Sequence, residues 1–187
     1  AMLQEADGLL STFNALLRIS QIESGAKREN FTELNFSHIV NDVIELYEPL
    51  ASDKNIVLQQ DVSLNAIVTG DKDLLFQMLL NLIDNAIKYT PEGGAISIQL
   101  VHLESMVRFN IVDTGVGIPE KQRKKVFQRF YRVEESRSLQ PGNGLGLSLV
   151  KAVVNLHAGD IKLTDSLGYF AKAQRPGLTV TITLPLA

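Results

Sequence analysis

The sequence predicts an α+β fold: a two-layer α/β sandwich with helices packed on one face of a mixed, mainly antiparallel sheet, preceded by a lone amphipathic helix. Two observations lead to this prediction. Apolar residues recur at helical spacing in four segments, and shorter segments among them alternate with the two-residue period of strands. Two of these strands are joined by a short polar turn, which predicts a hairpin and therefore antiparallel pairing.

The composition is that of one globular domain with a short additional element. The chain has 187 residues, of which 45% are apolar and 21% charged, and its formal net charge is −3. Because the chain is slightly acidic, we expect no nucleic-acid partner. The absence of cysteine and the presence of only three histidines exclude disulfides and argue against a structural zinc site. No apolar run is long enough to form a membrane segment.

The first predicted element is an amphipathic helix from about Leu3 to Ser24, ended by Gly25. Its apolar face is formed by Leu3, Ala6, Leu9, Leu10, Phe13, Leu16, Leu17 and Ile22. This face either packs on the domain that follows or belongs to a dimeric bundle whose other helix lies elsewhere. We favour the bundle, and therefore expect this helix to be frayed, swapped between molecules or paired in a non-native way. Residues 26–35 are polar and are predicted to be a linker.

Helices and strands follow one another in the remainder, residues 36–187, which we expect to be one domain. Ser37 is the predicted N-cap of a helix that ends near Asp53, and Asp71 that of a helix that ends at Tyr89. A further helix is predicted from residue 145 to residue 157. Strands are predicted at residues 56–62, 66–69, 95–101, 106–112, 160–164 and 179–184.

Two asparagines lie on one face of the predicted helix that ends at Tyr89. Asn81 and Asn85 are four residues apart, and Lys88 and Tyr89 follow near the helix end. Asparagine is a mediocre helix former, so a pair on one face needs an explanation. From these residues alone, a ligand-binding site and two solvent-exposed positions are equally good interpretations.

Two glycine-rich segments are further candidates for ligand binding. Asp113 follows an apolar strand and precedes Gly115 and Gly117; its carboxylate can accept a hydrogen bond from an amino group such as that of adenine, and the glycines allow a flat ligand to approach. Residues 142–147 (Gly-Asn-Gly-Leu-Gly-Leu) precede a helix, whose N-terminal amide groups favour a phosphate. A simple turn and a flexible helix cap are the alternative interpretations.

In this order, the three segments resemble the catalytic ATP-binding domain of bacterial sensor histidine kinases, in the GHKL superfamily shared with gyrase B, MutL and Hsp90. Residues 81–91 resemble the N box of that family, 113–119 its first glycine box, 126–132 its F box and 142–147 its second glycine box. Residues 18–25 resemble the end of the second helix in the family's dimerisation and histidine-phosphotransfer bundle. The resemblance implies that residues 1–25 are an incomplete part of this bundle and 36–187 the catalytic domain.

The resemblance implies a role for each candidate residue. Asp113 would bind the adenine amino group, Asn85 would ligate Mg²⁺, Asn81 would lie near the phosphates and Lys88 would neutralise phosphate charge. Asn81, Asn85 and Lys88 are thus the implied catalytic residues, with ATP and Mg²⁺ as cofactors. The other implied nucleotide-binding residues are Tyr89, Gly115, Gly117, Ile118, Phe130, Gly142, Gly144, Leu145, Gly146 and Leu147.

Residues 118–143 are implied to form a mobile lid, with Phe127 and Phe130 as its apolar anchors. A basic run at residues 121–125 could contact an acidic partner, although a solvated face is the commoner interpretation. The segment 168–177 departs from the shorter glycine-rich connection that is usual in the family before the last strand. The sequence assigns no role to it.

The implied function is transfer of the ATP γ-phosphoryl group to a histidine, for relay to an aspartate of a response regulator. Hydrolytic members of the superfamily resemble one another in having a glutamate at the position of Asn81, and an amide cannot act as a general base. We therefore expect a kinase rather than a rapid ATPase. A GHKL-type ATPase and an ATP-binding regulatory module without phosphotransfer are the alternatives.

None of the three histidines resembles the phosphoacceptor of the family. His38 follows a predicted helix cap, His102 lies at a hairpin turn, and His157 lies near a helix end, where an imidazolium would interact favourably with the helix dipole. We expect the acceptor to lie on a bundle helix outside this sequence, so that this chain does not phosphorylate itself. The resemblance implies a homodimeric parent that acts on a response-regulator receiver domain, anchored in the inner membrane with this part in the cytoplasm.

Overall fold

The computed structural model describes residues 2–25, 28–133, 142–170 and 175–187. The helices are α1 (Met2–Glu23), α2 (Phe36–Asp53), α3 (Lys72–Tyr89) and α5 (Gly146–Leu156), with short 3-10 turns η1 (Arg28–Asn30), η2 (Glu120–Gln122) and η3 (Lys125–Phe127). The strands are β1 (Thr32–Asn35), β2 (Val57–Val62), β3 (Ile67–Gly70), β4 (Ala95–His102), β5 (Met106–Asp113), β6 (Asp160–Thr164) and β7 (Leu178–Pro185). Every predicted helix and strand forms within about two residues of its expected limits.

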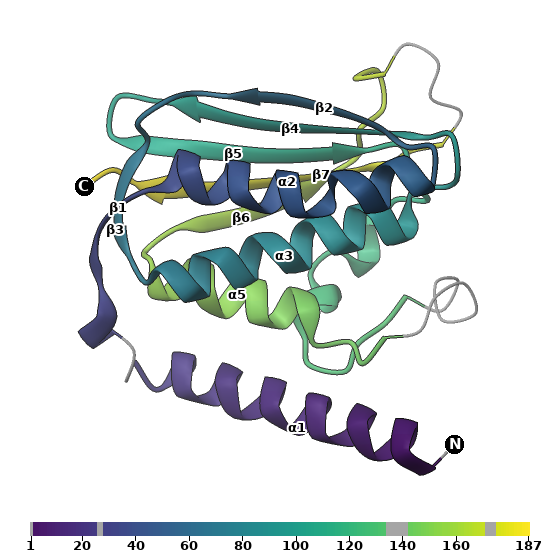
Figure 1. The fold of residues 1–187 in the computed structure, drawn as a ribbon, viewed down its shortest axis with the longest axis horizontal. Helices are drawn as coiled ribbons and strands as arrows, with labels where there is room; N and C mark the ends of the chain where they lie inside the picture. Colours follow the sequence, from purple (N-terminus) through teal and green to yellow (C-terminus); the bar gives the residue numbers. More distant parts are fainter. Residues whose placement is uncertain (1, 26–27, 134–141, 171–174) are drawn as a thin grey trace.

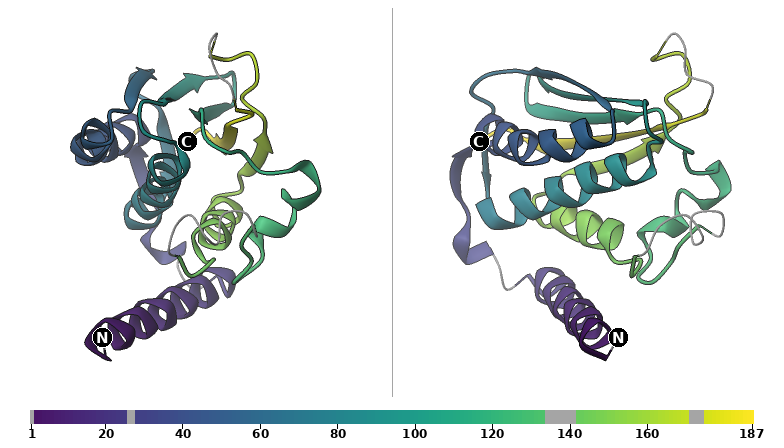
Figure 2. Two further views of the ribbon diagram at one scale, coloured as in Figure 1. Left: turned by 90° about the vertical axis from the view of Figure 1, so that its right-hand side faces the viewer. Right: turned by 45° about the vertical axis from the view of Figure 1, so that its right-hand side comes forward.

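The predicted α+β sandwich is confirmed. Five strands form a sheet in the order β2-β4-β5-β7-β6, in which β2 and β4 are parallel and all other neighbours antiparallel. The predicted hairpin is β4–β5, with Ile96 opposite Asp113. Helices α2, α3 and α5 lie on one face of this sheet (Figures 1 and 2). Strands β1 and β3 pair in a separate antiparallel sheet.

The hydrophobic core lies between the sheet and helix α3. This helix contacts α2, α5 and strand β5. Its inward face consists of Leu74, Leu75, Met78, Leu79 and Ile83, all fully buried and spaced at three and four residues. The facing strands contribute Ile96, Ile98, Leu100 and Phe109, which are also fully buried. Since α3 is packed on three sides, the polar residues along its remaining face are held in fixed positions.

The N-termini of α2 and α3 have side-chain caps, one of which differs from the prediction. Asp71 caps α3, as predicted, by accepting a hydrogen bond from the Leu74 amide at 3.0 Å. Asn35, not Ser37, caps α2, by accepting from the Ser37 amide at 3.1 Å. Ser37 is buried inside the helix, where its hydroxyl donates to the Ser63 carbonyl at 2.6 Å. The prediction failed because both residues are of capping type and only tertiary contact distinguishes them.

The stretch predicted as a linker is partly structured. Residues 32–35 form strand β1, which pairs with β3, and Leu34 lies opposite Val68. The Phe31 ring stacks on His157 with 4.6 Å between the ring centroids. Residues 32–35 were not predicted as a strand because they show no clear apolar alternation. Their strand forms by pairing with β3, which lies about 35 residues further along the chain. Residues 26–27 lie outside the described part.

Helix α1 packs on the domain through its C-terminal half. Ile19 and Ile22 are buried against the core, and α1 contacts α5, beneath which it lies in Figure 1. Four apolar side chains nearer its N-terminus are 45–73% exposed: Leu9, Leu10, Phe13 and Leu17. The C-terminal half is thus packed on the domain and not frayed, which is the alternative that we did not favour, whereas Leu9, Leu10, Phe13 and Leu17 remain exposed. The side chains of Leu3 and Ala6 lie outside the description.

Gly25 ends α1 with a positive φ of 74°, as the sequence predicts. Within the described residues, no helix is both long and apolar enough to cross a lipid bilayer.

Candidate functional site

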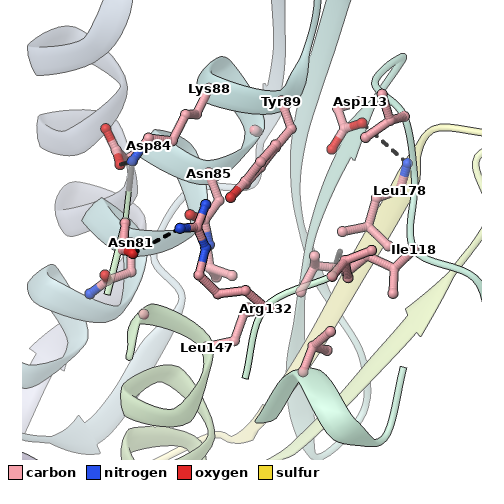
Figure 3. A pocket seen from close by; sticks show the side chains of 18 of the residues that line it. Asn81, Asp84, Asn85, Lys88, Tyr89, Asp113, Ile118, Arg132, Leu147 and Leu178 are labelled. Atoms are coloured by element: carbon pink, nitrogen blue, oxygen red, sulfur yellow. Dashed lines mark hydrogen bonds and ion pairs between the residues drawn. The ribbon is translucent and has the colours of Figure 1, made fainter. Parts of the chain in front are cut away.

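A cavity of about 320 Å³ opens between the C-terminal half of α3, the ends of β5 and β7, and the N-terminus of α5 (Figure 3). The predicted site residues that line it are Asn81, Asn85, Lys88, Tyr89, Asp113, Gly117, Ile118, Gly142, Gly144, Gly146 and Leu147. Three predicted residues do not line it: Gly115, Phe130 and Leu145. The fold therefore brings together segments that are up to 66 residues apart in the sequence.

Asp113 is the last residue of β5 and is only 5% exposed. Its Oδ1 accepts hydrogen bonds from the Gly115 amide at 2.8 Å and the Leu178 amide at 3.2 Å. Burial raises the pKa of this carboxyl from 3.8 to about 6, although the two hydrogen bonds act in the opposite direction. Because both bonds use Oδ1, Oδ2 is available to a hydrogen-bond donor in the cavity.

The side chains that surround Asp113 in the cavity are apolar. Ile111, Ile118, Leu178 and Val180 line this end of the cavity together with Val116. Such a surface suits a flat apolar ligand with one polar edge. We refer to Asp113 and these apolar side chains as the base end, after the base that the sequence resemblance implies for Asp113.

Gly115 and Gly117 shape the base end without binding through side chains. A Cβ at Gly115 would lie 2.6 Å from the Tyr89 carbonyl oxygen, so Gly115 brings the end of α3 against the end of β5. Gly117 has a φ of +73°, and a Cβ there would lie 2.6 Å from the Gly177 carbonyl oxygen. Both positions therefore require glycine to keep the cavity walls in place.

The opposite end of the cavity is polar. Asn81 and Asn85 are half-buried on α3 and face Gly146 of α5; a Cβ at Gly146 would lie 3.2 Å from Asn81 Oδ1 and 3.8 Å from Asn85 Nδ2. The Asn81 Nδ2 donates to the Gln77 carbonyl at 2.9 Å, which directs its Oδ1 towards α5. The two asparagines thus face another element of the site rather than open solvent.

The amide oxygens at this end fit a hard divalent cation only as part of its ligand set. Mg²⁺ prefers oxygen ligands and usually takes several of them from water and substrate phosphates. Among the residues that the structure describes, no cluster of three or more His, Asp or Glu side chains could hold a metal by itself. The donor set therefore suits Mg²⁺ that arrives with a phosphate ligand.

Helix α5 differs from α2 and α3 because no side chain caps its N-terminus. Leu145, the residue before the helix, is 2% exposed and packs in the core, and its amide donates to Asn143 Oδ1 at 3.1 Å. The first two residues of α5, Gly146 and Leu147, line the cavity. An uncapped N-terminus of this kind favours an anion. We call this polar region, from Asn81 to Leu147, the phosphate end.

Phe130 is not the apolar anchor that the sequence predicts. Its side chain is 56% exposed, and its backbone is in the left-handed region with a φ of +64°. The reason is a close backbone contact: the Phe130 amide donates to the Gly144 carbonyl at 3.0 Å, and a Cβ at Gly144 would lie 2.9 Å from Phe130 Cα. Phe127, in contrast, packs against the core as predicted. Residues 134–141 of the predicted lid lie outside the described residues.

Two cationic side chains reach the phosphate end. Lys88 Nζ lies 3.9 Å from Asp84 Oδ2, and both side chains are partly exposed, so this pair is weak. Arg132 was not among the predicted site residues, yet it lines the cavity, and Figure 3 shows its side chain extending towards Asn81 and Asn85. Its Nη1 donates to the Gly142 carbonyl at 3.1 Å. Arg132 is the last residue of the segment 126–132 that resembles the F box, and this resemblance could have identified it as a site residue.

The basic run 121–125 is partly tied to the domain rather than fully solvated. Arg123 Nε donates to the Ile118 carbonyl at 3.0 Å, and its guanidinium forms an ion pair with Asp165. Arg123 thereby holds the backbone at the rim of the cavity. This contact could not be found from sequence, because Asp165 is 42 residues away.

His157 is buried and makes hydrogen bonds within the domain. It is 6% exposed, its Nε2 accepts from the Asp71 amide at 3.1 Å, and its Nδ1 lies 2.8 Å from the Val153 carbonyl. Burial is the main cause that lowers its pKa. Burial therefore opposes the imidazolium that the helix dipole would favour, and the hydrogen bonds of His157 are those of a structural residue. His38 and His102 are exposed, and neither lines the cavity.

Comparison with known proteins identifies relatives of this architecture. Residues 70–187 match the family described as histidine kinase-, DNA gyrase B-, and HSP90-like ATPase. The sensor-like histidine kinase SenX3 of Mycobacterium tuberculosis is 32% identical over 185 residues, which cover 98% of this chain and 43% of SenX3. The chain thus spans less than half the length of this relative.

Two solved structures are similar in fold. The mycobacterial sensor histidine kinase MprB has a TM-score of 0.73 and 31% identity, with 83% of this chain and 97% of that chain covered. Full-length ShkA in complex with AMPPNP has a TM-score of 0.80 and 27% identity, with 98% of this chain and 37% of that chain covered.

Proposed function

The chain belongs to the histidine kinase-, DNA gyrase B- and HSP90-like ATPase family and is homologous to sensor histidine kinases, and from this premise we propose that its cavity binds Mg²⁺-ATP for phosphoryl transfer to a histidine. The observation that carries the proposal is the buried Asp113 carboxylate at an apolar end of the cavity whose other end is an uncapped helix N-terminus. One ligand with a flat amino-bearing base and an anionic tail satisfies both ends.

At the base end, Asp113 Oδ2 accepts a hydrogen bond from the exocyclic amine of adenine. Oδ1 is already held by two backbone amides, so the carboxylate does not need to reorient when the base binds. The apolar walls exclude water, which strengthens this hydrogen bond and selects a flat ring.

At the phosphate end, the α5 amides and the cations Lys88 and Arg132 bind the anionic tail. Asn85 would hold Mg²⁺ through its side-chain oxygen, with Asn81 beside it, and the ion would neutralise charge that develops during phosphoryl transfer. ShkA, one of the similar proteins of known structure, was solved in complex with AMPPNP, which supports the proposal.

The side chains that line the cavity favour transfer to a histidine over hydrolysis. The lining carboxylates among the described residues are Asp113, which is engaged at the base end, and Asp84, which lies beside Lys88. Asn81 cannot remove a proton from water. The phosphoryl group therefore passes to an imidazole that enters from a separate bundle helix, and from there to an aspartate of a response-regulator receiver domain.

The parent protein is proposed to be a homodimer in which the exposed face of α1, from Leu9 to Leu17, pairs in the bundle. Its relatives are sensor kinases, which supports a parent anchored in the inner membrane with this part in the cytoplasm.

Calorimetric titration with ATP, in the presence and absence of Mg²⁺, tests the proposal. We expect saturable binding that Mg²⁺ strengthens, no acid-labile phosphate on this chain, and no sustained release of inorganic phosphate. Sustained release would identify an ATPase instead. The absence of binding at millimolar ATP would contradict the nucleotide site altogether.

A further inference from the structure

The connection between β6 and β7 contains the segment 168–177, to which the sequence assigned no role, and it meets the base end of the cavity. Ser166, at its start, is 2% exposed. Its hydroxyl donates to the Asp113 carbonyl at 2.7 Å and lies 3.0 Å from the Pro176 carbonyl. The Ser166 amide donates to the same Pro176 carbonyl at 2.9 Å, so the two ends of the connection are joined. Residues 171–174 within it lie outside the described structure.

The other end of the connection contacts the same part of β5. The Gly177 amide donates to the Gly115 carbonyl at 3.0 Å. Gly177 has a φ of +59°, and a Cβ there would lie 1.9 Å from Ser166 Oγ and 2.1 Å from the Asp113 carbonyl oxygen. A side chain at residue 177 would therefore collide with both partners of the Ser166–Asp113 hydrogen bond, so this contact requires glycine at position 177.

The connection also leads directly to a group that holds the Asp113 side chain. Leu178 follows Gly177, pairs with Asp113 across β5 and β7, and donates its amide to Asp113 Oδ1. One short segment thus fixes Asp113 in two ways, through its carbonyl by the Ser166 hydroxyl and through its carboxylate by the Leu178 amide. Asp165, adjacent to Ser166, pairs with Arg123 at the rim of the same cavity.

We infer that Ser166 is a positioning residue for adenine recognition: its hydroxyl fixes the backbone of Asp113 and so directs the Asp113 carboxylate at the 6-amino group of the base. The inference rests on the proposed function. Ser166 does not line the cavity, so it acts through Asp113 and not by contact with the nucleotide. The consequence is specific, since only ligands that carry a 6-amino group depend on the direction of this carboxylate.

The test compares Ser166→Ala with wild type for two ligands, ATP and purine riboside triphosphate, which lacks the 6-amino group. Ser105→Ala is the matched control, because Ser105 is exposed at the β4–β5 turn, at the opposite end of β5. We expect Ser166→Ala to weaken ATP binding about three- to tenfold, as for the loss of one oriented hydrogen bond, and to leave the analogue nearly unchanged. Ser105→Ala should change neither affinity.

Two further variants separate positioning from a purely structural effect. Ser166→Thr keeps the hydroxyl and should retain the preference for ATP, even if the added methyl lowers the melting temperature. In an Asp113→Asn background, Ser166→Ala should cause no further loss of ATP affinity, because the group it positions is already changed. If Ser166→Ala does not fold, Ser166→Cys makes the same comparison with a side chain of similar shape that is only a weak donor.

Equal weakening of both ligands, or an unchanged preference for ATP in both Ser166→Ala and Ser166→Cys, would overturn the inference. So would a full additional loss in the Asp113→Asn background. These outcomes are distinct from failure of the proposed function, which would appear as absence of ATP binding by the wild-type chain.

Discussion

The two ends of the cavity are built in different ways. At the base end, Asp113 is buried at the end of a central strand and its carboxylate already has two backbone donors. At the phosphate end, α5 has no side-chain cap, Lys88 has only a 3.9 Å contact with Asp84, and Asn81 and Asn85 are half-buried. In Figure 3 the two ends lie on either side of Tyr89.

This difference indicates where the free energy of binding arises. The base end is organised by folding, which buries a carboxylate at a cost to stability and so prepares it for a hydrogen-bond donor. At the phosphate end, the charged side chains and the helix N-terminus are expected to gain their binding partners only when an anion and its cation bind. A well-ordered base end should therefore set which nucleotide binds, and the phosphate end should set how binding depends on Mg²⁺.

The largest expected effect is at the base end. Asp113→Asn should weaken ATP binding by about a hundredfold, because a charged acceptor is replaced by an amide that can present a donor to the adenine amine. The same change should raise the free energy of unfolding by about 1–3 kcal/mol at neutral pH, because a buried charge is removed. Calorimetry and urea unfolding measure the two effects. Asp61→Asn, an exposed carboxylate on β2, is the control and should alter neither.

A loss of both affinity and stability in Asp113→Asn would contradict the account of the base end, since it would mean that the carboxylate stabilises the unliganded fold.

A smaller effect is expected at the phosphate end. Asn85→Ala should abolish the strengthening of ATP binding by Mg²⁺, a change of about tenfold, and should leave Mg²⁺-free binding nearly intact. Asn155→Ala, an exposed asparagine on α5, serves as control. Titrations with and without Mg²⁺ measure the change. Equal weakening under both conditions would mean that Asn85 contributes to the base end or to folding instead.

The smallest effect is a pH dependence of stability that belongs to Asp113. The folded-state pKa of about 6 lies above the ordinary 3.8, so the neutral carboxyl is favoured in the folded chain and its stabilising effect is lost as pH rises through about 6. The stability advantage of Asp113→Asn over wild type should therefore grow by about 1 kcal/mol between pH 5 and pH 7. Urea unfolding of both proteins at the two pH values measures it; a constant or shrinking advantage would refute the raised pKa.

Much of this architecture follows from local patterns in the sequence. The helices and the strands of the larger sheet were predictable because their apolar periods are strong, and Asp71 was identified as a cap by its position before α3. Strand β1 was missed, because its four residues pair with a strand far along the chain. In α1, part of the apolar face packs on the domain and part is exposed. The repeating apolar pattern is the same in both parts, so it could not show which part packs.

The site shows the same division between local and tertiary information. Asp113, Asn85 and the glycine segments were found from residue types and order. Leu178 and Ser166 were not, because their roles depend on the register of β5 with β7 and on a connection that returns to the end of β5. Phe130 was wrongly assigned as an anchor because its backbone contact with Gly144 turns its side chain outwards.

Amide hydrogen exchange, followed residue by residue with and without Mg²⁺-ATP, tests the contrast between the two ends most directly. The account predicts that the Gly115 and Leu178 amides, which donate to Asp113, are protected in both states, whereas the amides of Gly146 and Leu147 become protected only when nucleotide is bound. Protection that first appears at Gly115 and Leu178 on binding, with Gly146 and Leu147 already protected in the free chain, would contradict it.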